Sequence, residues 1–169
     1  MLKLRLASML MLSLLAGMLS ACGFEPLYGT TPVGSSTARE LSRITVEEQK
    51  TRLGQLVRNK LLSSMSPGGT VEEHYRLRLV ATSETETAVD DADDLVRRAV
   101  LKVDVAYELS DPASARVLHT GKTFSRIAYD RNDADYSNVQ AETNAMEKAA
   151  DEVGTDIRTR LAAYFASAK

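Results

Sequence analysis

The feature that most constrains the fold is a long alternation of apolar and polar side chains in the middle of the chain. Period-two alternation predicts half-buried strands, here over residues 71–89, about 95–109 and about 116–129. The acidic cluster Asp90, Asp91, Asp93, Asp94 is interpreted as the turn of a long hairpin, and Asp111-Pro112 favours a second turn. The side chains expected on the inner face are Tyr75, Leu77, Leu79, Ala81, Ala99, Leu101, Val103, Val105, Tyr107 and Leu109.

Two amphipathic helices and one more strand flank this region. Residues 41–48 alternate and predict a strand, whereas steps of three and four predict a helix over 51–65, ended by Ser66-Pro67-Gly68-Gly69. A capping box at Ser137 and Gln140 predicts the start of a helix of about 28 residues, which Gly154 weakens by about 1 kcal/mol relative to Ala. Its apolar stripe, interpreted as core more than as a binding groove, is Val139, Met146, Ala150, Val153, Ile157, Leu161 and Tyr164.

The predicted order is strand, helix, three strands, helix. We expect an α+β domain over residues 41–169, with two helices packed on one face of a mainly antiparallel four-stranded sheet. The first strand reaches its neighbour through the short helix, so at least one pairing is expected to be parallel.

The first 21 residues have the layout of a signal peptide. Lys3 and Arg5 precede a charge-free stretch of 16 residues from Leu6 to Ala21, shorter than the roughly 20 that a spanning helix needs. The end, Leu19-Ser20-Ala21-Cys22, looks like the bacterial lipobox, in which the cysteine is acylated and becomes the first residue. The segment resembles the start of bacterial lipoproteins, and in that class a glycine such as Gly23 after the cysteine is consistent with sorting to the outer membrane. The several acyl chains of such lipoproteins give a stable anchor.

Residues 22–40 are interpreted as the lipidated cysteine and a tether. Gly29 to Thr37 is rich in Gly, Pro, Ser and Thr and lacks apolar residues for burial. Phe24, Leu27 and Tyr28 differ from it, and two interpretations stay open: they dock on a partner, or they rest in the lipid interface.

Composition excludes several classes of function. Without Lys3 and Arg5, 19 of the 21 basic residues remain against 23 acidic ones, a net charge of −4, so no nucleic-acid partner is expected. A single cysteine excludes an internal disulfide and paired-cysteine zinc sites. The bases for catalysis at neutral pH are His74 and His119, and neither lies in a catalytic motif. We expect no enzymatic activity, no cofactor and no metal, since the acidic runs lack the glycine and distal glutamate of an EF-hand.

A basic sheet face is the candidate binding site. The alternation places Arg76, Arg78, Arg98 and Lys102 on the face opposite the inward residues, and Lys122 with Arg126 extend the set if the register of their strand allows. Arginine matches phosphate oxygens in a bidentate manner, so a phosphorylated lipid or an acidic protein wall fits. In the alternative, Asp104 and Glu108 neutralise these cations as ordinary cross-strand pairs.

The chain resembles the LPS-assembly lipoprotein LptE family in its alphaproteobacterial form. The matching residues are Cys22-Gly23-Phe24-Glu25-Pro26-Leu27-Tyr28-Gly29, Tyr136-Ser137-Asn138, Ala141-Glu142 and Ile157-Arg158-Thr159-Arg160-Leu161. The resemblance implies a lipoprotein anchored on the periplasmic side of the outer membrane. It implies a protein that plugs and helps assemble the LptD β-barrel and binds lipopolysaccharide on its way to the cell surface.

Two other classes stay open. A periplasm-facing lipid carrier or transport-accessory lipoprotein would need an apolar cavity, for which 5% aromatic residues offer little lining. A lipid-anchored enzyme would require turnover that depends on His74 or His119.

A soluble form that lacks residues 1–22 is expected to fold, because the predicted core lies entirely within 41–169. Dispersed amide signals in a proton–nitrogen correlation spectrum would support this prediction. A spectrum typical of a molten globule would contradict it.

Overall fold

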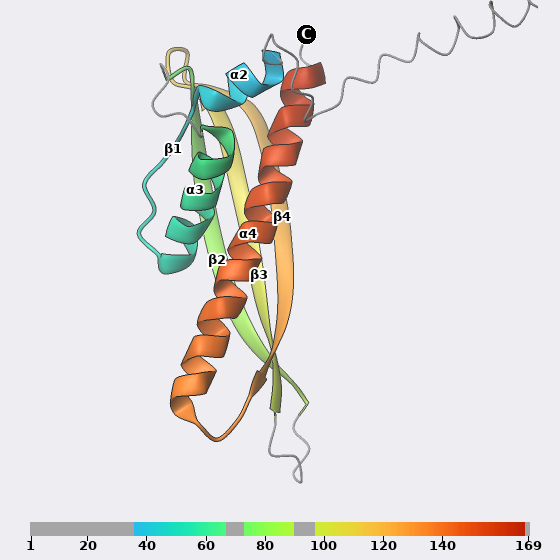
Figure 1. Ribbon diagram of the computed structural model, residues 1–169. Helices are drawn as coiled ribbons and strands as arrows, with labels where there is room; N and C mark the ends of the chain where they lie inside the picture. The colour runs from blue at the N-terminus through green and yellow to red at the C-terminus, as the bar shows by residue number, and fades with distance from the viewer. Residues whose placement is uncertain (1–35, 67–72, 90–96, 168–169) are drawn as a thin grey trace, which may run out of the picture. The chain divides into compact units, whose positions relative to one another are not determined.

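A computed structural model describes residues 36–66, 73–89 and 97–167 of the chain. The sheet order is β1-β2-β3-β4, and α3 and α4 lie on one face of the sheet (Figure 1). This arrangement confirms the predicted α+β class. The elements are α2 (Ser36–Ser42), β1 (Ile44–Val46), α3 (Arg52–Met65), β2 (Tyr75–Val89), β3 (Arg97–Asp111), β4 (Arg116–Arg131) and α4 (Asp135–Ser167).

The sheet is mixed, as the connection through the first long helix predicted. β1 pairs in parallel with β2, with Ile44 opposite Tyr75. β2 with β3 and β3 with β4 pair antiparallel over nearly their whole lengths. Every predicted inward residue of β3 is buried, as are Leu77 and Leu79 of β2, because alternate side chains of a strand point to the same face.

The N-terminal part of the domain differs from the prediction. α2 occupies the last residues of the predicted tether and the first two of the predicted strand, so the strand shrinks to Ile44–Val46. Leu41 is buried, and the carboxylate of Glu40 accepts a hydrogen bond from Tyr75 Oη at 3.0 Å. These tertiary contacts stabilise α2 as a helix, although the composition of the segment favoured a tether. The tether before residue 36, the signal peptide and Cys22 lie outside the described residues, as does the acidic hairpin turn.

The prediction of α3 is confirmed. Thr51 is its N-cap, with Oγ1 accepting from Gly54 N at 3.1 Å, which satisfies one of the amides that a helix start leaves unpaired. Buried Leu53, Val57, Leu61 and Met65 recur every fourth residue and form the face that packs on the sheet and on α4.

The start of α4 corrects the predicted capping box. The helix begins at Asp135, so Ser137 lies inside it. Ser137 Oγ donates to Asn132 Oδ1 at 2.7 Å and to Ala134 O at 2.8 Å. Asn138 exchanges two hydrogen bonds with the backbone of Asn132, at 2.9 and 2.7 Å. A short network from the preceding turn therefore replaces the reciprocal Ser–Gln cap.

The buried stripe of α4 is shorter at its N-terminal end than predicted. Burial begins at Ala145, and Val139, predicted to lie in the core, is 64% exposed. The reason is the extent of α3, whose first residue Arg52 pairs with Glu147 at 3.7 Å. α3 therefore does not extend beside the first turns of α4.

Gly154 has a packing role that outweighs its low helix propensity. A Cβ on Gly154 would lie 2.7 Å from Lys60 Cγ of α3, so its hydrogen lets the stem of Lys60 cross α4 closely. The Lys60 ammonium then pairs with Asp151.

Gly121 of β4 allows Tyr107 of the neighbouring strand to lie across it. A Cβ on Gly121 would be 2.4 Å from Tyr107 Oη, and Tyr107 is buried. We expect Gly121→Ala to lower the free energy of unfolding by about 1–3 kcal/mol, as overpacking typically does, measured by urea unfolding.

The matched control is Ala128→Val, an exposed position on the other face of β4, with an expected change within about 0.5 kcal/mol. In a protein that already carries Tyr107→Leu, Gly121→Ala should lower the free energy of unfolding much less, because the side chain with which the new Cβ clashes has been removed. Equal costs for Gly121→Ala with and without Tyr107 would contradict the contact.

Candidate functional site: the uncovered face of the sheet

The sheet face opposite the helices is the candidate site. Register places its outward side chains in rows across β2, β3 and β4, such as Val80, Ala106 and Lys122, and then Glu84, Lys102 and Arg126. The alternation that buries one face leaves this one without a covering layer among the described residues. Its side chains are available to a ligand or a partner.

The predicted cations lie on this face but do not form one patch. Arg76 stands opposite Ser110 near one end of β2, whereas Arg98 stands opposite Val89. The thirteen-residue step along β2 from Arg76 to Val89 corresponds to a separation of about 43 Å. Lys102 lies between these ends, opposite Arg126 on β4.

Each predicted arginine has an acidic neighbour. Arg76 pairs with Glu73 at 3.2 Å, Arg78 with Glu47 at 3.6 Å and Arg98 with Asp130 at 3.0 Å. The proposed neutralisation is seen in part: Glu108 faces Arg78 in register, but Asp104 lies between Thr82 and Phe124. Exposed ion pairs contribute only about 0–1 kcal/mol, so an anionic ligand can displace these carboxylates at small cost.

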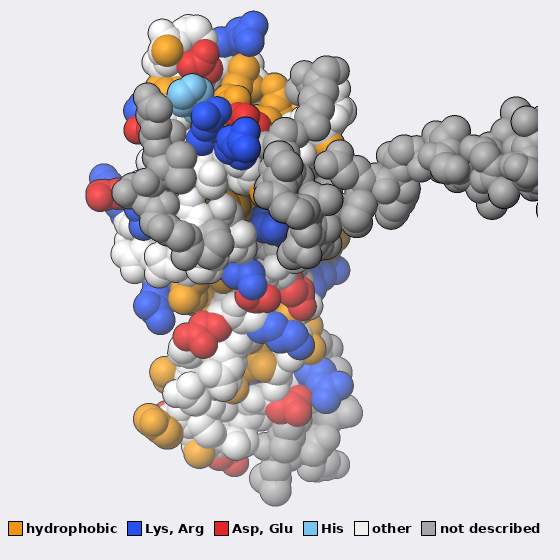
Figure 2. Space-filling model, turned by 45° about the horizontal axis from the view of Figure 1, so that its top comes forward, with side chains coloured by type: hydrophobic (Ala, Val, Ile, Leu, Met, Phe, Trp, Pro, Cys, Tyr) orange, Lys and Arg blue, Asp and Glu red, His pale blue; other side chains and the backbone are white. Residues whose placement is uncertain are grey.

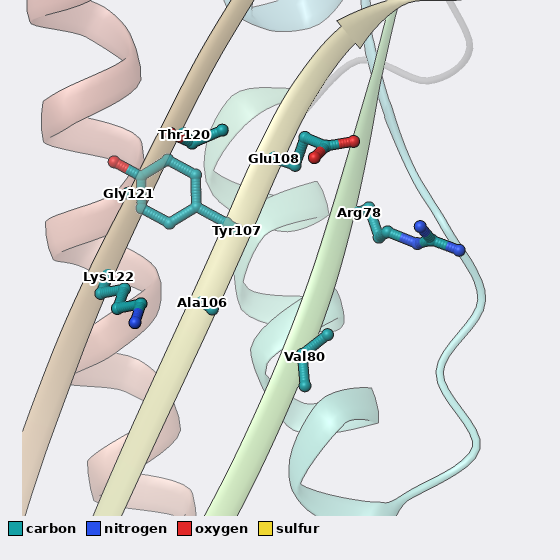
Figure 3. Close-up of a pocket in the computed structure, with 8 residues that line it drawn as sticks. All are labelled: Arg78, Val80, Ala106, Tyr107, Glu108, Thr120, Gly121 and Lys122. Atoms are coloured by element: carbon teal, nitrogen blue, oxygen red, sulfur yellow. The ribbon is translucent and has the colours of Figure 1, made fainter. Parts of the chain in front are cut away.

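A shallow hollow of about 360 Å³ lies on this face, nearer the end of the sheet at which β2 and β4 begin (Figure 3). Ala106 is at its centre, because a methyl group stands there between longer side chains. Five other residues of this face border it: Arg78, Val80, Glu108, Thr120 and Lys122. Gly121 and the ring of Tyr107, which reaches toward β4, complete its lining. Sequence alternation identified the face but missed the hollow, whose position depends on the register between β3 and β4.

Lys122 is the cation best placed toward this hollow. In Figure 3 its side chain extends toward Ala106, whereas the guanidinium of Arg78 turns outward to Glu47. Within the part of the chain that the structure describes, no carboxylate lies within 4 Å of the Lys122 ammonium. Among the described residues Lys122 therefore makes no ion pair, although Glu108 borders the same hollow.

Apolar surface lies directly beside these cations. Val80 is 60% exposed and Phe124, two residues from Lys122 on β4, is 67% exposed. Solvent-exposed phenylalanine next to lysine on a sheet face is suited to a ligand that combines hydrocarbon with negative charge.

The two histidines belong to a run of contacting rings. His119 stacks on Tyr164 with ring centroids 5.1 Å apart, and its Nε2 lies 3.4 Å from Tyr107 Oη. Tyr164 contacts Phe165, which packs on Tyr75 beside His74. Burial raises the pKa of Tyr107, and burial followed by the hydrogen bond to Glu40 raises the pKa of Tyr75. These contacts give both histidines a packing role.

Acidic side chains near the end of β4 and the start of α4 have structural roles. Asp130 pairs with Arg98, while Asp133 and Asp135 lie at the N-terminus of α4, where its dipole favours negative charge. Among residues 36–66, 73–89 and 97–167, no cluster of three metal-ligating side chains occurs. No helix within those ranges is both long and apolar enough to cross a membrane.

Comparison with known proteins gives structural relatives. A proposed lipoprotein from Caulobacter crescentus CB15 matches with a TM-score of 0.68 and 25% identity, over 79% of this chain and 97% of the other. A minor lipoprotein from Acinetobacter baumannii matches with a TM-score of 0.53 and 12% identity, over 71% and 88% of the two chains. The second match shows the fold alone. No established protein family and no curated protein matches in sequence.

Proposed function

We propose that this protein is an outer-membrane lipoprotein of the LPS-assembly type, which plugs and helps assemble the LptD β-barrel and binds lipopolysaccharide. The observation that carries the proposal is the uncovered sheet face, where Lys122 and Arg78 border a hollow beside exposed Val80 and Phe124. Lipopolysaccharide has phosphates next to acyl chains, so one surface with both kinds of group suits it.

The phosphate contacts are expected from the cations at the hollow. Lysine offers a compact charge with rotatable donors, and arginine a planar fork that matches two phosphate oxygens. Arg78 would exchange Glu47 for a phosphate, and Lys122 would contribute a charge that has no ion pair to break among the described residues. The acyl chains would then lie on Val80 and Phe124.

The anchor part of the proposal rests on sequence and on a relative. Cys22 ends a lipobox-like segment, and the Caulobacter crescentus relative, matched over 97% of its length, is itself a proposed lipoprotein. Several acyl chains on Cys22 would hold the domain at the periplasmic side of the outer membrane.

The barrel part rests on surface chemistry. Charged side chains of both signs are mixed over the helical side of the domain (Figure 2), and the sheet face has its own ion pairs. The interior of an outer-membrane barrel is polar, so a domain with polar exteriors on both layers can lie within it. In this role the protein acts by binding and shape, without catalysis.

Purification of the full-length protein from its native outer membrane in a mild detergent tests the proposal as a whole. We expect a large β-barrel protein to copurify in a near one-to-one amount, identified by mass spectrometry. Recovery of the protein alone, or with an inner-membrane transporter, would contradict the proposal and favour the carrier or accessory role.

Charge reversal at the hollow tests lipopolysaccharide binding separately. We expect Lys122→Glu to weaken binding about tenfold or more, in the range for loss of a charge-assisted hydrogen bond, and Arg78→Glu with Lys122→Glu to weaken it further. Fluorescence titration with lipopolysaccharide measures the affinity.

The matched control is Arg98→Glu, the same change of charge on the same face near the other end of the sheet. We expect it to weaken binding much less than Lys122→Glu. Equal losses would show a general electrostatic attraction, and unchanged binding in the double variant would contradict a site at the hollow.

A further inference from the structure

The apolar stripe of α4 continues past the end of the domain's own core. Tyr136, Val139 and Thr143 are spaced by three and four residues, and the helical period puts them on the same side of α4 as buried Val153 and Ile157. Nevertheless Tyr136 is 84% and Val139 64% exposed. We call these three residues the stripe end.

The stripe end is exposed because the helical layer is incomplete. α3 runs beside α4 from the level of Glu147 onward, as the pairs Arg52 with Glu147, Lys60 with Asp151, and Arg158 Nε with Ser64 O show. Figure 1 shows the lower half of α4 with no helix alongside it. The inward side chains of Ser83 and Thr85 on β2 are exposed, so this part of the layer has room for another element.

The stripe end is held in a fixed conformation. Hydrogen bonds of 2.7–2.9 Å between Asn132 and the residues Ser137 and Asn138 join the loop after β4 to the first turn of α4. Helical turns with little tertiary packing are only marginally stable alone, and this network replaces that packing. A surface ordered before binding loses less conformational entropy on binding.

The chemistry of the stripe end favours a protein over a lipid surface. A tyrosine exposed on a rigid element is typical of binding hot spots, and hydrophobic side chains lie at the surface around the start of α4 in Figure 2. The segment 131–144, which carries Tyr136, Val139 and Thr143, has three acidic residues, Asp133, Asp135 and Glu142, against one basic residue, Arg131. Anionic phosphates are disfavoured there, and a partner with lysine or arginine is favoured.

We infer that the stripe end is a docking site for a segment of the barrel partner with apolar side chains bordered by Lys or Arg, which completes the helical layer beside α4. The inference rests on the proposed function, because it identifies where the same partner is held. The site lies in the helical layer and is distinct from the hollow on the opposite face of the sheet.

Site-specific photo-crosslinking in the native membrane tests the inference. The full-length protein would carry Tyr136→benzoylphenylalanine, with Phe124→benzoylphenylalanine on the sheet face and Val117→benzoylphenylalanine near the other end of β4 as comparisons. We expect a crosslink from position 136 to a barrel peptide that has basic residues beside apolar ones.

Other outcomes overturn the inference in distinguishable ways. If the barrel copurifies but position 136 crosslinks to phospholipid, to this chain or to nothing, the docking site is wrong and the proposed function stands. If no barrel is recovered by purification or from any position, both are wrong.

Paired variants provide a second readout. Tyr136→Ser with Val139→Ser should reduce the amount of copurified barrel at least about tenfold while leaving the thermal unfolding midpoint unchanged, because both side chains are exposed. Val117→Ser, also an exposed valine, should leave barrel recovery unchanged. Unchanged recovery in the double variant would overturn the inference.

Discussion

The packing of α4 on the inner face of the sheet is the interaction on which the rest of the structure depends. Val153, Ile157 and Leu161 are almost fully buried, and each such side chain contributes roughly 1.5–3 kcal/mol. Alanines and Gly154 on the same helix let α3 approach closely. Since both long helices are committed to one face, the other face of the sheet keeps its outward side chains for binding.

A polar seam between α4 and β4 sets how the helix is rotated. Buried Ser125 Oγ donates to Glu152 Oε2 at 2.6 Å, and Asp156 and Arg160, at successive four-residue steps, interact with each other on the same helix. Polar groups at the edge strand and apolar groups over the centre favour one orientation of α4. That orientation keeps Tyr136 and Val139 on the core side of α4, beyond the level that α3 reaches.

The sequence predicted the elements well because their signals are local. Alternation identified both faces of β2 and β3, including Leu101 and Tyr107, and helical spacing identified α3. The positions of the cations along the sheet were missed. Counting residues back from the acidic turn would have placed Arg98 opposite the end of β2 and far from Arg76. The hollow at Ala106 depends on the pairing of β3 with β4, and the start of α4 depends on Asn132. Neither has a signal within a single element.

Two surfaces of opposite character on opposite layers allow binding events that do not compete. The hollow combines Lys122 with exposed apolar side chains, whereas the stripe end combines Tyr136 and Val139 with carboxylates. A barrel segment docked on the helical layer would leave the sheet face free, so a lipid could bind and leave while the protein stays in place. If one surface served both ligands, each arriving lipid would have to displace the partner. Under the proposed function, this separation is what a plug that also handles lipid requires, and it would make lipid affinity and barrel association separable by mutation.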